Sequence, residues 1–170
     1  MGIEIERKFL VNGEGWRAAA DKVTAMAQGY LSGPPSMEAG GAKASVRVRV
    51  QGEAAFLNIK SVQLGASRQE FEYPIPVTEA RALLALCTGG IVDKRRHYVR
   101  HAGHLWEVDE FLGDNAGLVV AEIELQREDE PFEKPDWAGA DVTEQARYYN
   151  LVLASRPYSQ WTPAEQRGEA

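Results

Sequence analysis

The chain has little of several things that other classes of protein need. Among its 170 residues there is a single cysteine, Cys87, which excludes an internal disulfide and a zinc site built from several cysteines. No apolar run reaches the roughly 20 residues of a membrane span, and residues 1–6 lack the basic and apolar regions of a secretion signal. We therefore expect a cytoplasmic protein that has no membrane partner.

Positive charge is also scarce. The 19 Lys and Arg residues are outnumbered by 25 Asp and Glu residues, giving a net charge of -6, so we expect no nucleic-acid partner bound through a broad basic surface. The length and the 44% hydrophobic content suit one folded domain, which we place at residues 1–157, followed by a polar, frayed tail at 158–170. The sequence leaves open whether the protein is a monomer or a homodimer.

What is abundant is alternation of apolar and polar residues with a period of two, which predicts strands with two unlike faces. It occurs at 3–11, 45–50, 56–60, 68–75, 94–100, 105–111 and 119–125, with an eighth strand expected at 28–31. Glycine-rich turns separate these segments, a spacing that favours an antiparallel sheet or barrel.

Helices are fewer, and we expect them at 16–27, 78–87 and 143–154. Residues 32–44 are rich in Gly and Pro and are expected to form a long loop.

The polar faces of the strands carry charges of both signs. They hold seven cations, Lys8, Arg47, Arg49, Lys60, Arg68, Lys94 and Arg96, and seven anions, Glu4, Glu6, Glu70, Glu72, Asp109, Glu122 and Glu124. For any one strand the simpler interpretation is a face exposed to water. Over seven strands the density favours a charged interior, because a closed barrel of about eight strands has room for one small ligand.

Such an interior has a chemical use. Paired carboxylates on neighbouring strands can hold Mg²⁺ or Mn²⁺, which prefer oxygen ligands and share them with substrate phosphates. Arg and Lys side chains opposite them would bind the remaining phosphate oxygens. The pattern therefore predicts a polyphosphate site, which a strong local field makes possible in a protein of negative net charge.

Residues 4–8, Glu-Ile-Glu-Arg-Lys, match the Glu-x-Glu-x-Lys signature of CYTH domains, the triphosphate tunnel metalloenzymes. Further blocks that are similar to the family's follow in family order at 28–31, 47–49, 60–61, 67–72, 94–96, 107–109 and 122–124. The chain thus resembles this family over nearly its whole length. The resemblance implies an α+β fold in which an eight-stranded antiparallel β-barrel tunnel with a charged interior is flanked by a few α-helices.

The resemblance also implies roles for particular residues. The implied metal ligands are Glu4, Glu6, Glu122 and Glu124, and the implied phosphate-binding residues are Lys8, Arg47, Arg49, Lys60, Arg68 and Arg96. Glu70, Glu72 and Asp109 would supply counter-charges to the cations. Lys94 would handle the proton of the attacking water, because desolvation and neighbouring cations lower the pKa of a lysine. Tyr30 would hydrogen-bond Lys94 or that water, whereas the simpler interpretation of a tyrosine at the start of a strand is a packed core residue.

The activity implied is hydrolysis of a small-molecule triphosphate, inorganic tripolyphosphate, with Mg²⁺ or Mn²⁺ as cofactor. A class IV adenylyl cyclase and a thiamine triphosphatase are alternatives within the family, and an RNA triphosphatase fits least because no basic surface is evident. A noncatalytic polyphosphate-binding module is the alternative outside enzymes. Residues 147–150 also resemble the family, and the helix that follows could close one tunnel mouth or simply pack on the barrel.

Overall fold

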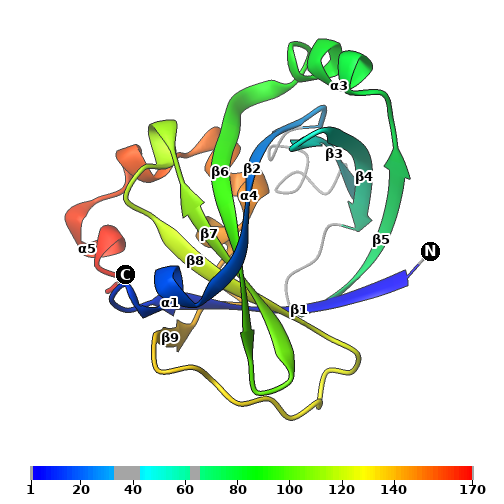
Figure 1. Cartoon of the computed structure of the whole chain (residues 1–170). Coiled ribbons are helices and arrows are strands. Elements are labelled where there is room, and N and C mark those ends of the chain that lie inside the picture. The colour runs from blue at the N-terminus through cyan, green and yellow to red at the C-terminus, as the bar shows by residue number, and fades with distance from the viewer. Residues whose placement is uncertain (1, 33–42, 62–65, 170) are drawn as a thin grey trace.

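The computed structural model describes residues 2–32, 43–61 and 66–169, in which nine strands form one antiparallel sheet (Figure 1). The strands are β1 (Gly2–Val11), β2 (Ala20–Tyr30), β3 (Ala44–Gln51), β4 (Ala54–Ser61), β5 (Ser67–Pro74), β6 (Thr88–His101), β7 (His104–Phe111), β8 (Val119–Leu125) and β9 (Ala138–Asp141). Their order is β5-β4-β3-β2-β6-β7-β8-β1-β9, and β1 also pairs with β5. That last pairing closes eight strands into a barrel, which confirms the expected fold class.

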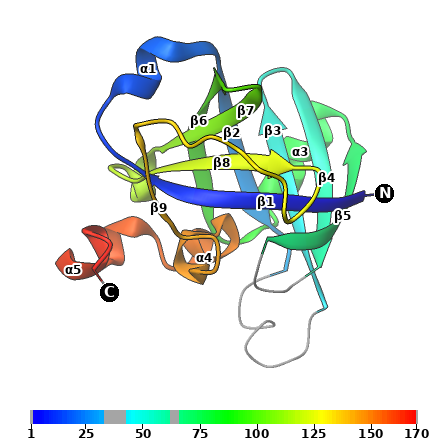
Figure 2. The same ribbon diagram turned by 90° about the horizontal axis from the view of Figure 1, so that it is seen from below.

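The helices are short and lie around the barrel (Figures 1 and 2). They are α1 (Gly15–Ala19), α3 (Val77–Leu84), α4 (Asn150–Ser155) and α5 (Pro163–Gln166), with 3-10 turns η1 (Gly113–Asn115), η2 (Ala146–Tyr148) and η3 (Tyr158–Gln160). None of the helices within the described ranges has the length and apolar character needed to cross a bilayer.

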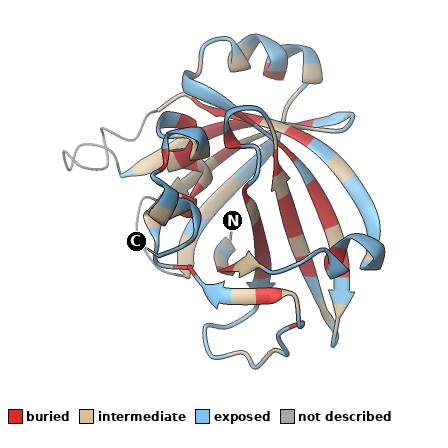
Figure 3. Ribbon diagram, turned by 90° about the vertical axis from the view of Figure 1, so that its left-hand side faces the viewer, coloured by how far each residue is buried: buried red, intermediate tan, exposed pale blue. Residues whose placement is uncertain are grey.

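The apolar faces of the strands pack against these helices and connecting segments. Buried residues lie along most of the barrel strands (Figure 3). Val48 and Ala55 pack beneath Ala80 of α3. A larger cluster joins β1, β6, β7 and β8 to α1 and β9, and it contains Phe9, Trp16, Val99, Trp106, Val108, Ala121, Ile123, Leu125 and Ala138. The hydrophobic core therefore lies outside the barrel wall, and the polar faces of the strands line the interior. Each fully buried large side chain of this core contributes about 1.5–3 kcal/mol to stability.

The expected helix at 16–27 is wrong. Only Gly15–Ala19 is helical, and the next eleven residues form β2, which pairs with β3 on one edge and β6 on the other. Three alanines and a methionine gave this segment a helical composition, but intrinsic propensity is a weak preference that tertiary pairing overrides. As a strand, the segment satisfies its backbone groups on both edges and lets the barrel close.

The C-terminal part also differs from expectation. The predicted helix at 143–154 is reduced to α4, which follows the turn η2, and α4 lies across one end of the barrel (Figures 1 and 2). The tail is not frayed through residue 169, because Trp161 is only 5% exposed and packs edge-on against Tyr148 at 5.2 Å. The side chain of Thr162 caps α5 by accepting from the Glu165 amide.

The remaining expectations need smaller changes. The helix expected at 78–87 is present as α3, one residue earlier at its start and three residues shorter at its end. The strand that follows begins at Thr88, so the Gly89-Gly90 pair lies inside β6. Strand β9, which extends the sheet beside β1, had no counterpart among the expected strands. Most of the loop expected at 32–44 lies outside the described residues.

Gly29 of β2 allows the chain after α3 to approach the barrel closely. A Cβ atom at this position would lie 2.8 Å from Cys87 Sγ and 2.9 Å from Cys87 Cβ. Gly29→Ala is therefore expected to lower the free energy of unfolding by about 1–3 kcal/mol, because overpacking forces its neighbours to move. In the double variant, Cys87→Gly removes both atoms and should restore part of the loss. Urea denaturation tests this, and a loss under about 0.5 kcal/mol in the single variant would contradict the packing argument.

Candidate functional site

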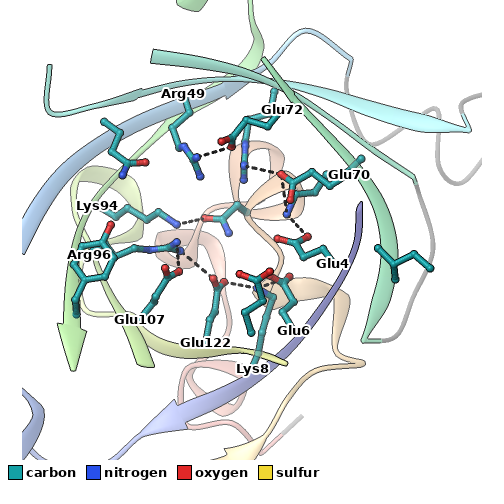
Figure 4. A pocket seen from close by; sticks show the side chains of 17 residues that line it. Glu4, Glu6, Lys8, Arg49, Glu70, Glu72, Lys94, Arg96, Glu107 and Glu122 are labelled. Carbon is teal, nitrogen blue, oxygen red and sulfur yellow. Dashed lines mark hydrogen bonds and ion pairs between the residues drawn. The ribbon is translucent and has the colours of Figure 1, made fainter. Parts of the chain in front are cut away.

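The interior of the barrel contains a cavity of about 450 Å³ (Figure 4). A smaller cavity of about 50 Å³ shares five lining residues with it, and these are Glu6, Lys8, Arg47, Lys60 and Asn150. All of the fourteen charged residues predicted from the strand faces line one of the two cavities except Asp109, which bonds to two cations that do. The structure thus brings together residues that are spread from position 4 to position 124.

The strand register explains the convergence. Alternate residues of β1 point inward, so Glu4, Glu6 and Lys8 all face the cavity. In the ladder with β8, Glu6 lies opposite Glu124 and Lys8 lies opposite Glu122. Directly opposed residues on neighbouring antiparallel strands have Cβ atoms roughly 4.5–5.5 Å apart, so β1 and β8 together form a carboxylate-rich floor.

Two of the floor carboxylates, Glu6 and Glu122, are fully paired with cations. Lys8 hydrogen-bonds Glu122 and its Nζ lies 3.2 Å from Glu6 Oε1, while Arg68 Nη2 donates to Glu6 Oε1 at 2.8 Å. Burial alone would raise the pKa of Glu122, but Lys8 and Arg96 outweigh it and hold that pKa well below its usual range. These carboxylates are therefore ionised at neutral pH.

Glu4 and Glu124 lie in a different electrostatic environment. Glu4 accepts a hydrogen bond from Lys60 at 2.6 Å, yet burial and the neighbouring charge of Glu6 raise its pKa to about 7. Glu124 is exposed at the edge of the cavity, and among the described residues no ion pair links it to a cation. Positive charge is therefore scarcer around Glu4 and Glu124 than around Glu6 and Glu122.

That shortage, together with a donor set made only of carboxylate oxygens, fits a hard divalent cation. Glu4, Glu6, Glu122 and Glu124 are the residues that could hold it. Within the described ranges no three His, Cys, Asp or Glu side chains are already grouped as around an ion, because Lys and Arg side chains occupy the spaces between the carboxylates. A cation held here would have to replace some of these ion pairs.

Lys94 and Arg96 of β6 share one buried carboxylate. Asp109, which is 1% exposed, accepts from Lys94 Nζ at 2.5 Å and from Nε and Nη2 of Arg96 at 2.7 Å each. Arg96 also bonds to Glu122 at 2.9 Å. Burial lowers the pKa of Lys94 to about 8, with Arg96 adding to the effect and Asp109 opposing it. The direction of this shift agrees with the one expected from sequence.

The opposite wall, formed by β3, β4 and β5, carries a second network. Arg49 donates to Glu72 at 2.9 Å, and Arg47 Nη2 lies 3.7 Å from Glu70. The buried Nε–H groups of the three arginines Arg47, Arg49 and Arg68 have no hydrogen-bond acceptor in the described structure. Since buried donors are normally satisfied, these three arginines have unused donor capacity, which suits binding of an anion with several oxygens.

Sequence reasoning missed some residues of the site. Glu107, two residues before Asp109 on β7, lines the large cavity and bonds to Arg96, so the same period-two pattern could have identified it. The Asn58 side chain, two residues before Lys60, donates hydrogen bonds to Glu70 at 2.8 Å and to Glu72 at 2.6 Å. Because Asn58 is uncharged, the pattern of charges on the strand faces did not indicate it.

Of the two partners predicted for the Tyr30 hydroxyl, Lys94 is not bonded to it within the described structure, and the attacking water stays a prediction. The hydroxyl accepts instead from the Gln28 side chain at 3.2 Å. Tyr30 lines the small cavity while its ring packs in the apolar cluster under α4. Lys94 bonds instead to Asn150 of α4 at 3.3 Å, a residue that no strand pattern could identify.

Comparisons with known proteins agree with this geometry. The family model described as CYTH domain matches residues 2–158. An inorganic triphosphatase of Acetivibrio thermocellus is 45% identical over 159 residues, which make up 93% of this chain and 97% of the relative. An inorganic triphosphatase of Nitrosomonas europaea is 37% identical over 158 residues, 89% of this chain and 96% of the relative. A crystal structure of an inorganic triphosphatase superposes with a TM-score of 0.61 and 34% identity, covering 96% of this chain and 98% of that one.

Proposed function

The chain belongs to the CYTH domain family, and from the charged residues that line the barrel interior we propose that it is a divalent-metal-dependent triphosphatase that hydrolyses inorganic tripolyphosphate. The observation that carries the proposal is the closed barrel whose interior is lined by ionised side chains of both signs. The names of the relatives, inorganic triphosphatase in each case, support the same substrate.

The cations bind and orient the substrate. Arg47, Arg49 and Arg68 present unsatisfied N–H groups, and Lys8, Lys60 and Arg96 exchange part of their pairing with carboxylates for phosphate oxygens. Transfer of a phosphoryl group is catalysed mainly by positioning and by stabilising charge on its oxygens. Glu70, Glu72 and Asp109 keep the cations in place when no substrate is bound, because unpaired buried charges are costly.

Glu4, Glu6, Glu122 and Glu124 would hold the metal, which we propose is Mg²⁺ or Mn²⁺. Such an ion would supply polarisation of the phosphate oxygens and activation of water for attack. Lys94 takes up the proton of the attacking water, since a lysine whose pKa is about 8 is partly neutral near neutral pH. Asp109 holds this amine beside the cavity.

We place the reaction in the cytoplasm, in keeping with one free cysteine, Cys87, and no disulfide in the described structure. The substrate is a small molecule, which suits a cavity of about 450 Å³ better than a polymer with base-paired structure. A monomer or homodimer remains the prediction for the oligomeric state.

The test is incubation of the purified protein with tripolyphosphate, ATP or thiamine triphosphate, each with Mg²⁺, with Mn²⁺ or with a chelator. Phosphate and pyrophosphate from tripolyphosphate, at the highest kcat/KM of the three and lost on chelation, are the expected result. Cyclic AMP from ATP would instead identify a cyclase, and preference for thiamine triphosphate would change the substrate. Tight binding of tripolyphosphate without turnover under any of these conditions would identify a binding module.

A further inference from the structure

Helix α4 brings a single polar side chain to the large cavity. Its buried residues Leu151, Leu153 and Ala154 belong to the apolar cluster on the outside of the barrel. Among the described residues of α4, Asn150 is the one that lines the large cavity, and it also lines the small one. Four other residues line both cavities, and all of them are charged: Glu6, Lys8, Arg47 and Lys60. Asn150 is therefore the uncharged residue among the five.

The position of Asn150 is fixed from outside the barrel. Tyr148 packs against Trp161 of the C-terminal segment, and the Tyr149 hydroxyl donates to the Thr143 carbonyl oxygen at 2.7 Å. These two residues directly precede Asn150, so the start of α4 is anchored on both sides. A side chain that begins from a fixed backbone loses little further freedom when it makes a directed contact.

The directed contact is with Lys94. Its Nζ has three N–H groups, of which one bonds to Asp109 Oδ2 at 2.5 Å and another to Asn150 Oδ1 at 3.3 Å. The aromatic ring of Phe111 lies 5.6 Å from the same nitrogen. With these neighbours in place, the third N–H group is left for the cavity, which Lys94 lines.

We propose that Asn150 is a positioning residue for Lys94, and that the C-terminal helix acts on the reaction through this one amide. The inference rests on the triphosphatase function and on the role of Lys94 in taking up a proton. A neutral acceptor suits that role, because it aims the amine without adding charge that would hold the proton on it. Asp109 already supplies the one carboxylate in contact with Lys94 among the described residues.

The charged groups around Lys94 come from three strands. Asp109 of β7 contacts it, and Arg96 of its own strand, Glu107 of β7 and Glu122 of β8 act on it through space. Because Asn150 is the neutral neighbour, changing its charge changes this balance in a known direction. An added carboxylate stabilises the ammonium form, whereas loss of the amide oxygen favours the neutral amine.

The experiment compares Asn150→Asp with Asn150→Leu, two variants of similar size. In the wild-type protein we expect kcat to rise with pH as Lys94 loses its proton, with a midpoint near pH 8. Asn150→Asp should move it upward by about one unit or more, and Asn150→Leu should move it downward. Asn150→Leu should also lower kcat about tenfold with KM changed less than about threefold, because the bound substrate then faces a misdirected amine. Asn150→Gln, which keeps the oxygen, should recover part of kcat.

Gln145→Leu is the matched control, since it removes an exposed amide that lies in the same segment, accepts only from Arg147 among the described side chains, and lines neither of the two barrel cavities. It should leave the pH profile unchanged, and melting temperatures identify any variant that simply unfolds. A second readout needs neither substrate nor metal: ¹³Cε NMR of the six lysines, assigned with Lys94→Met, follows the Lys94 titration directly.

Opposite shifts of the Lys94 titration in the Asp and Leu variants support the proposal. Shifts of the same sign, or none, in variants that remain folded would overturn it. If no triphosphate is hydrolysed at all, the proposed function fails, while the NMR titration still decides whether Asn150 controls Lys94.

Discussion

Replacing Glu6 or Glu124 with glutamine is expected to lower triphosphate turnover by about 100-fold or more, since even residues that only support metal ligands change activity by about 10- to 100-fold. The two residues face one another across β1 and β8, and glutamine keeps their size while removing their charge. Phosphate release at saturating tripolyphosphate, measured across a Mg²⁺ or Mn²⁺ titration, checks this. Calorimetric titration with the metal alone should show weakened binding in both variants.

The two variants should differ in stability although they share the loss of activity. Glu6 is the partner of Lys8 and Arg68, so Glu6→Gln leaves cations uncompensated and lowers the melting temperature. Glu124 is exposed and has no ion pair within the described structure, so Glu124→Gln should melt like wild type. Glu128→Gln, an exposed glutamate on the loop after β8, is the control that should change neither property. Turnover within threefold of wild type in both active-site variants would exclude these residues as metal ligands.

Arg96→Met is expected to destabilise the protein by about 3–5 kcal/mol, the cost of leaving a buried charge without its partner. Arg96 forms a two-pronged contact with Asp109 and also bonds to Glu107 and Glu122. The variant should lose turnover as well, because it lacks a guanidinium that is proposed to bind phosphate. Arg96→Lys should restore little, since an ammonium cannot bond to both oxygens of Asp109 in the planar geometry of guanidinium.

A double-mutant cycle separates lost pairing from lost packing. Combining Arg96→Met with Asp109→Asn removes both members of the main pair, and the double variant should be less destabilised than the sum of the single variants. Urea denaturation gives the free energies of unfolding. An Arg96→Met variant that unfolds within about 0.5 kcal/mol of wild type would show that this network contributes nothing to stability.

The ion-pair network shows how a protein of negative net charge can bind a polyanion. Inside the barrel, carboxylates and cations alternate closely enough to neutralise one another in the absence of ligand. If the cations bind triphosphate and the carboxylates hold the metal, as proposed, the two ligands should bind more tightly together than apart. The local arrangement of charge, rather than its total, therefore determines what the site can bind.

The sequence by itself determined which residues face the interior. Side chains alternate strictly along a strand, so Glu4, Glu6 and Lys8 had to share one face, and the same holds for Arg47 with Arg49. Alternation over many strands favoured an antiparallel sheet or barrel with a charged interior, and the resemblance to the CYTH family implied that the barrel is closed. Glu107 could have been found by the same rule.

Only the tertiary structure decided how these side chains pair and what else reaches them. Strand β2 was concealed by its alanine-rich composition, because hydrogen bonds to β3 and β6 outweigh local preference. The raised pKa of Glu4 beside the lowered pKa of Glu122 depends on burial and distance, which a linear pattern does not contain. Asn150 reaches Lys94 from 56 residues away, since packing of Trp161 and Tyr148 outside the barrel fixes the start of α4.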